Sequence, residues 1–282
     1  MLHLKALESC KLVVLIVTHV PIDDLPFGKS AMHHGISSCI QQVPSESSGH
    51  DAYFAKISGT LQYLKHSKRH RLYLLMDAFD TYFRHNASTI IDRFHSMNAA
   101  VVVSSEIAFT HQPQEWKHVF DSMSTSESRY LNSGMVMGYG NAMLRLMNAS
   151  AGSAYLKVEK KRGTDQASIA DVLVNLGFSL FDTQLDYGQQ LFYTASGRRW
   201  SLRISNEDIH RYDPTIVHFP FTAAPRVNRT FHASYDGECG MPWPEADEAF
   251  CKAQEQECAK SINGPYCHVG GGHRPGMNRL AC

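Results

Sequence analysis

The chain has 282 residues, of which 27 are basic and 27 acidic, so its formal net charge at pH 7 is zero. Its basic residues form no run longer than Lys160 to Arg162, and this excludes the charge pattern typical of a nucleic-acid or anionic-membrane partner. The apolar run near the N-terminus, Leu12 to Val17, is too short to span a membrane, and no targeting segment is visible. The length suits one large α/β domain with a small appendage.

The first part of the chain alternates apolar runs with helical patterns. Lys11 to Val20 reads as a buried strand in which polar residues appear only at the end. Phe27 to His34 predicts a short helix and Ile36 to Val43 a second strand. A longer helix begins at about Asp51, with apolar residues at helical spacing.

Two acids follow the next strand. Leu72 to Met76 is an apolar run of buried-strand length, and it ends in Asp77 and Asp80. Buried carboxylates are costly unless they are paired or bind a metal, and in open α/β sheets ligands bind at the carboxyl ends of strands. The alternative is that both acids only cap the following turn. The pattern therefore marks a candidate site without proving one.

The remaining elements continue the alternation of helix and strand. We expect a small-residue corner at 132–134 before another strand, and a short final strand that delivers His218 to the sheet edge. The alternation predicts an α/β fold with a largely parallel sheet. The other expected elements are helices at Ser88 to Met97, Asn141 to Met147 and from Asp165, and strands at Ala99 to Ser104, Phe178 to Phe181, Gln190 to Thr194 and Thr215 to Val217.

Polar residues therefore gather at the ends of several predicted strands: Thr18, Asp77, Asp80, Glu106 and His218. Two carboxylates and one imidazole suit an octahedral-type site for Mn²⁺ or Mg²⁺, whose remaining ligands are water or phosphate oxygens. Such an ion would neutralise the charge that develops on a leaving diphosphate. The chain has 16 histidines, so spacing alone does not assign His218 to the site.

The ordered motifs resemble a known family. Between Lys11 and Phe221 the chain contains KLVVLIVTHV, LLMDAFDTYF, VVVSSE, RYLNSGMVMGYG, TDQ, LDYGQQLFY and TIVH. This order is similar to that of the glycosyltransferase domain of the procollagen lysyl hydroxylases and related collagen glycosyltransferases. The resemblance implies a GT-A glycosyltransferase fold, which is Rossmann-like with a largely parallel central sheet. It also implies UDP-glucose or UDP-galactose as donor substrate, and Mn²⁺ or Mg²⁺ as cofactor.

Matching positions in the family imply roles on the donor side. Asp77 and Asp80 match the metal-binding acids, and His218 matches the third metal ligand. Thr18 matches a residue that faces the uridine, and Lys56 matches a lysine beside the nucleotide.

The resemblance also implies a ring contact and an acceptor side. Phe79 takes the place of an aromatic residue that packs on the uracil ring. Asp165 and Gln166 match the acidic patch where the transferred sugar meets the acceptor, and we expect catalytic roles for both. Asp186 matches the acid of an LD pair and is a third catalytic candidate without a defined role.

Two departures from the family pattern bear on activity. Phe219 to Phe221 replaces Gly-Asn-Gly after the histidine, and Ala224 stands where a lysine is expected to bind the diphosphate. Arg226, two residues further on, is our candidate for the missing cation. Thr164 replaces an aspartate of the acidic patch, so the acceptor is expected to differ.

Three functions compete. The preferred one is a metal-dependent glycosyltransferase that moves glucose or galactose from a UDP-sugar to a hydroxyl of a hydroxylated protein or a glycoprotein. The alternative is a non-catalytic relative that binds glycan or nucleotide, which the altered segment after His218 favours. A phosphohydrolase of the haloacid-dehalogenase type is disfavoured, because its motif has one residue between the two acids and this chain has two.

The C-terminal region has a different composition. We divide the chain into a glycosyltransferase domain, 1–230, and a tail, 231–282, that is rich in Cys, Gly and Pro and too small to fold without cross-links. Five of the seven cysteines lie in this tail, which favours disulfides and a structural role over a lectin-like cap. We expect Cys10 and Cys39 to be free and buried.

The sequence also predicts a compartment. Cysteine usage and three acceptor patterns for N-glycosylation, at Asn86, Asn148 and Asn228, favour the lumen of the endoplasmic reticulum or Golgi, or the extracellular space.

Overall fold

A computed structural model describes residues 7, 9–18, 22, 26–44, 50–77, 80–157, 164–195 and 209–218. Phe79, Arg226, the altered segment after His218 and the tail at 231–282 lie outside these residues. Within the described part, no helix is long and apolar enough to cross a membrane.

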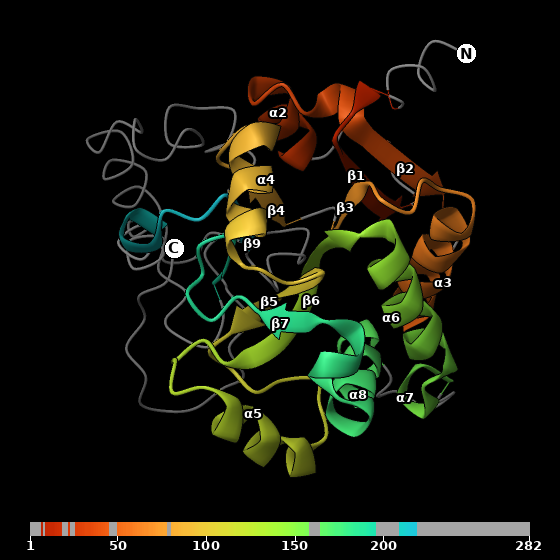
Figure 1. Ribbon diagram of the computed structural model, residues 1–282, viewed down its shortest axis with the longest axis vertical. Helices are drawn as coiled ribbons and strands as arrows, with labels where there is room; N and C mark the ends of the chain where they lie inside the picture. Colours follow the sequence, from red (N-terminus) through yellow and green to blue (C-terminus); the bar gives the residue numbers. More distant parts are fainter. Residues whose placement is uncertain are drawn as a thin grey trace, which may run out of the picture.

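A six-stranded sheet forms the centre of the molecule (Figure 1), with strand order β2-β1-β3-β6-β5-β7. Strand β6 is antiparallel to both neighbours, β3 and β5, whereas the other neighbouring pairs are parallel. The prediction of a largely parallel α/β sheet is thus confirmed. The strands are β1 (Leu12–Thr18), β2 (Ile40–Pro44), β3 (Leu72–Met76), β5 (Val101–Glu106), β6 (Tyr130–Tyr139) and β7 (Thr183–Leu185).

Helices cover both faces of this sheet because its central strands are apolar on both sides. Val13 and Leu15 of β1 pack into a cluster with residues of α3, α6 and α8, whereas Val14 and Ile16 pack with residues of α2 and α4. Successive side chains of a strand point to opposite faces, so one continuous apolar run supplies both halves of the core. The helices are α2 (Pro26–His33), α3 (His50–Lys65), α4 (Ala87–Ser96), α5 (Lys117–Met123), α6 (Gly140–Gly152), α7 (Ala154–Lys157) and α8 (Asp165–Leu176).

A second, three-stranded sheet carries the end of the described chain. Its order is β4-β9-β8, with β4 at Thr81–Phe83, β9 at Ile216–His218 and β8 at Phe192–Thr194. Strands β4 and β9 are antiparallel and pair Thr81 with His218. Because β4 follows β3 closely, this pairing carries His218 to the region where β3 ends.

Three local expectations were wrong. Residues 132–134 lie inside β6 and form no corner. Phe178–Phe181 forms a 3-10 helix between Gly177 and Asp182, both of which have positive φ, and pairing with β5 begins only at Thr183. Cys10 and Cys39 form a disulfide, since β1 and the short 3-10 helix Ser37–Cys39 bring their Cα atoms within 5.7 Å.

His34 links stability to pH. Partial burial lowers its pKa to about 4, and the nearby His33 and His85 add to this effect. Its Nε2 is buried and has no hydrogen-bond partner within the described residues. An imidazole with a lowered pKa is neutral in the folded protein and takes up a proton on unfolding.

We therefore expect the free energy of unfolding to fall as the pH drops from about 6.5 toward about 4, because over this window the unfolded chain binds a proton at this imidazole that the folded chain does not. In His34→Gln the decline over this window should be smaller, because no imidazole has to be protonated. Denaturant unfolding at several pH values tests this, with the exposed His66→Gln as control. Identical pH profiles for His34→Gln and wild type would contradict it.

Candidate metal centre

Asp77, Asp80 and His218 meet at one edge of the central sheet. Asp77 directly follows β3, Asp80 directly precedes β4, and His218 ends β9. One ligand atom from each residue lies within 4.8 Å of the other two. The structure thus brings together all three residues predicted as metal ligands, although the histidine is far from the acids in sequence.

The contacts within this cluster leave room for a cation. His218 Nε2 lies 3.5 Å from Asp77 Oδ2 and 3.4 Å from Asp80 Oδ1. It is buried and has no hydrogen-bond partner among the described residues. A buried nitrogen that lies between two carboxylates without a hydrogen bond to either fits a divalent ion that all three groups share. The donor set, two carboxylates and one imidazole, suits Mn²⁺ or Mg²⁺.

Lys56 on α3 connects this cluster to a third acid. Its ammonium group lies 2.6 Å from Asp77 Oδ1 and 2.8 Å from Asp165 Oδ2, and it donates a hydrogen bond to the carbonyl oxygen of Ser133 at 2.8 Å. Burial would lower the pKa of Lys56, but Asp165 and Asp77 outweigh it and hold the pKa above its ordinary value. The side chain is therefore a fixed positive charge between two carboxylates.

The cluster carries more acidic groups than basic ones. Burial raises the pKa of Asp77, and Asp80 adds to the rise, while Lys56 and His218 oppose it. Burial lowers the pKa of His218, but the two acids, Asp80 first, raise it above the ordinary value. Burial is thus the main cause of the Asp77 shift, whereas the nearby carboxylates cause the His218 shift. A bound divalent cation would favour the ionised form of both acids.

The acceptor-side residues lie next to Lys56. Asp165 and Gln166 begin α8, whose first turn is capped by the Thr164 side chain accepting from the Ala167 N–H. Gln166 Nε2 donates to Glu106 Oε1 at 3.0 Å, and its Oε1 accepts from the Ser133 N–H at 3.3 Å. Thr164, the departure from the family pattern, thus serves as a helix cap.

Glu106, predicted as one of the polar residues at strand ends, belongs to the same network. Its side chain is fully buried, and Oε2 has no partner among the described residues. A buried carboxylate oxygen without a partner beside Gln166 adds another acceptor to the site.

The other predicted residues have different surroundings. Thr18 is buried at the carboxyl end of β1, which runs parallel to β3 and so ends at the same sheet edge as Asp77. Asp186 is buried, and its carboxylate accepts from the backbone N–H groups of residues 190–192. These bonds anchor the turn between β7 and β8, so a catalytic role for Asp186 stays a prediction.

Gly134 belongs to the segment that the sequence predicted as a small-residue corner, and in the structure it lies beside His218. A Cβ at this position would lie 2.2 Å from His218 Cε1, so only glycine lets the imidazole pack against β6. Gly inside a strand pattern indicates close approach of another group, and that pattern would have suggested such a contact.

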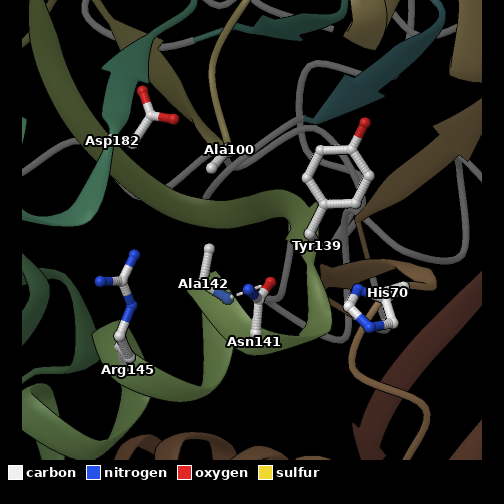
Figure 2. Close-up of a pocket in the computed structure, with 7 residues that line it drawn as sticks. All are labelled: His70, Ala100, Tyr139, Asn141, Ala142, Arg145 and Asp182. Carbon is white, nitrogen blue, oxygen red and sulfur yellow. Dashed lines mark hydrogen bonds between the residues drawn. The ribbon is translucent and has the colours of Figure 1, made fainter.

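A cavity of about 430 Å³ lies elsewhere (Figure 2). Tyr139 at the end of β6 and Ala100 just before β5 place it at the opposite sheet edge from the cluster. The candidate metal centre therefore lies outside this cavity. Its lining residues are His70, Ala100, Tyr139, Asn141, Ala142, Arg145 and Asp182.

Comparison with known families agrees with this geometry. The family model described as the PLOD GT domain matches residues 14–161, just over half of the chain. The chain belongs to the PLOD GT domain family. Thr18, Lys56, Asp77 and Asp80 lie inside the matched range, whereas Asp165 and His218 follow it. No sequence among the curated proteins matches the chain.

The chain is similar to solved glycosyltransferases. A glycosyltransferase involved in the glycosylation of the major capsid of the virus PBCV-1 has 13% identity and a TM-score of 0.50, covering 79% of this chain and 98% of its own. Mouse xyloside xylosyltransferase 1 has 10% identity and a TM-score of 0.44, covering 75% and 98%. The bifunctional glycosyltransferase WbbM has 10% identity and a TM-score of 0.43, covering 74% and 45%. The family match and the likeness to the first of these structures, with its TM-score of 0.50, agree with the predicted GT-A glycosyltransferase fold.

Replacing both acids of the cluster should remove metal binding. We expect Asp77→Asn/Asp80→Asn to weaken Mn²⁺ binding by more than about 100-fold, because loss of outer-shell groups alone costs 10- to 100-fold. Electron paramagnetic resonance of free Mn²⁺ gives the dissociation constant. The control is Asp92→Asn, an exposed acid on α4. Equal Mn²⁺ affinity in the double variant and the control would rule out this centre.

Proposed function

We propose that this PLOD GT domain is a metal-dependent hexosyltransferase that moves glucose or galactose from a UDP-sugar to a hydroxyl of a protein or a protein-linked sugar. The observation that carries this proposal is the Asp77, Asp80 and His218 cluster at the carboxyl edge of a GT-A sheet. A protein that binds only glycan has no need for a cluster of metal-ligating side chains at this edge.

We assign binding of the UDP-sugar donor to the metal cluster and the residues around it. Asp77, Asp80 and His218 would hold Mn²⁺ or Mg²⁺, which stabilises the charge on the leaving diphosphate. Thr18 would face the uridine from the end of β1. Phe79 would pack on the uracil ring, and Arg226 would supply the cation that Ala224 does not.

Lys56, which the family resemblance predicts beside the nucleotide, is assigned a positioning role there. Its three contacts leave the ammonium group directed at the protein's own oxygens, two of them carboxylate oxygens. It keeps Asp77 and Asp165 close together despite their like charge. Donor and acceptor sides are thereby joined through one side chain.

Asp165 and Gln166 are assigned to the acceptor. Both are buried at the start of α8, and Lys56 and Glu106 hold them in place. A carboxylate and an amide offer the acceptors and donors that orient hydroxyl groups. The expected acceptor is therefore a hydroxylated protein or a glycoprotein, whose hydroxyl would be aligned beside the donor sugar.

We assign the protein to the lumen of the secretory pathway or to the extracellular space. The Cys10–Cys39 disulfide supports this, because disulfides persist in oxidising compartments. Asn86 and Asn148 of the N-glycosylation patterns are both exposed.

The compartment can be tested on protein secreted from animal cells behind an added signal peptide. We expect the purified chain to lose mass on treatment with peptide N-glycosidase, since exposed acceptor asparagines are glycosylated in the lumen. Asn86→Gln/Asn148→Gln should lose less mass. A chain that folds only when made in the reducing cytosol, without the Cys10–Cys39 bond, would contradict the assignment.

The activity can be tested by UDP release from a panel of UDP-sugars, with Mn²⁺ present or chelated. We expect slow hydrolysis of UDP-glucose or UDP-galactose that needs Mn²⁺ and that falls by at least about 100-fold in Asp77→Ala/Asp80→Ala, because several kcal/mol of charge stabilisation are lost. Asp92→Ala is the matched control.

The same preparation separates the competing functions. Mn²⁺-dependent UDP binding without turnover on any donor would favour the non-catalytic relative. No turnover and no Mn²⁺-dependent UDP binding would reject the proposal. Unchanged UDP affinity in Arg226→Ala would exclude that residue as the diphosphate cation.

A further inference from the structure

Asn132 lies behind the metal-binding histidine. It belongs to β6, is 5% exposed, and its Oδ1 lies 3.2 Å from His218 Nδ1. His218 thus has one ring nitrogen facing Asp77 and Asp80 and the other facing an amide oxygen. None of the sequence motifs pointed to this contact.

The orientation of the Asn132 amide is fixed by the backbone. Its Oδ1 accepts a hydrogen bond from the Gly134 N–H at 2.9 Å. A backbone N–H can only donate, so the atom that faces it must be the amide oxygen and not the nitrogen. The buried Ser104 hydroxyl lies 3.4 Å from the same oxygen and 2.8 Å from the Asn132 backbone carbonyl, and it holds the residue from the β5 side.

This orientation determines the tautomer of His218. An amide oxygen carries no hydrogen, so His218 Nδ1 must be the donor in the 3.2 Å contact. In the neutral ring the lone pair then resides on Nε2, the nitrogen that faces the two acids. A nitrogen needs this lone pair to bind a metal ion.

We propose that Asn132 is a positioning residue that fixes the tautomer and the ring orientation of His218 for metal binding. The proposal rests on the metal-dependent function proposed above and names a residue through which that centre is tuned. Metal-ligating histidines commonly donate their second ring N–H to an oxygen acceptor, which orients the ring and raises its basicity.

Gly134 makes this arrangement possible. A Cβ at this position would lie 2.4 Å from His218 Nδ1 and 2.9 Å from Asn132 Oδ1, so any side chain would separate the two residues. The N-S-G segment of β6 thus combines the acceptor, Asn132, with the space for the ring, Gly134.

The test uses the full chain and measures Mn²⁺ affinity by electron paramagnetic resonance. We expect Asn132→Leu, which has similar size and no acceptor, to weaken Mn²⁺ binding by about 10- to 100-fold. Asn132→Asp restores an acceptor for Nδ1–H and should retain affinity within a few-fold of wild type. Asn175→Leu, at an exposed asparagine of α8, is the matched control.

A second measurement requires no change at Asn132. In the wild-type chain labelled with ¹⁵N-histidine and saturated with Mg²⁺, the His218 signal, identified by its loss in His218→Gln, should show the proton on Nδ1. A proton on Nε2 would overturn the proposal, whether or not the Asn132 variants fold.

The outcomes separate this inference from the proposed function. Wild-type affinity in Asn132→Leu, or equal losses in Asn132→Leu and Asn132→Asp, would overturn the positioning role while leaving the metal centre intact. A wild-type chain that binds neither Mn²⁺ nor Mg²⁺ would overturn both.

Discussion

The ion pairs of Lys56 are the interaction on which this site depends. Asp77, Asp80 and Asp165 gather at one sheet edge, where Asp80 and Asp165 are buried and Asp77 is partly exposed. A buried carboxylate without a partner costs several kcal/mol. Lys56 compensates two of these three acids, and His218 faces the two that belong to the metal cluster. The carboxylates still outnumber the basic groups of the site. The protein thus keeps a centre whose electrostatics favour a divalent cation and, with it, the phosphates that such a cation binds.

The small sheet gives His218 its position. Strand β9 pairs with β4, and since β4 begins immediately after Asp80, the Thr81 to His218 pairing sets the imidazole beside the acids. The backbone hydrogen bonds between β4 and β9 therefore fix the position of His218 relative to Asp77 and Asp80, which lie in the first third of the chain. The local sequence around His218 does not specify this pairing. A change in the register of β9 by one residue would turn His218 to the other face of this sheet.

The sequence predicted much of the fold because continuous apolar runs mark buried strands directly. The predicted bounds of β3, Leu72–Met76, match those observed, and the two acids after it were placed correctly. Two of the three local failures, at 132–134 and at the Cys10–Cys39 pair, came from contacts between distant segments. The segment at 132–134 resembles a turn in composition, yet its small residues serve the packing of His218. The short strand that ends at His218 was predicted, but its pairing with β4 was not, so His218 was assigned as a metal ligand from family resemblance. The Cys10–Cys39 pairing likewise depends on how β1 and β2 are placed.

The reversed direction of β6 explains why a strand interior can serve the site. The neighbouring strands β3 and β5 reach the site with their carboxyl ends, but β6 runs the opposite way and reaches it with its first half. Its backbone there is still in the sheet, so it is rigid, and it offers the Ser133 carbonyl to Lys56 and the Gly134 carbonyl to the Asp77 N–H. Side chains on a paired strand have fewer positions available than those on a loop. Asn132 can therefore hold the His218 ring in one orientation, which a residue on a mobile connection could not do.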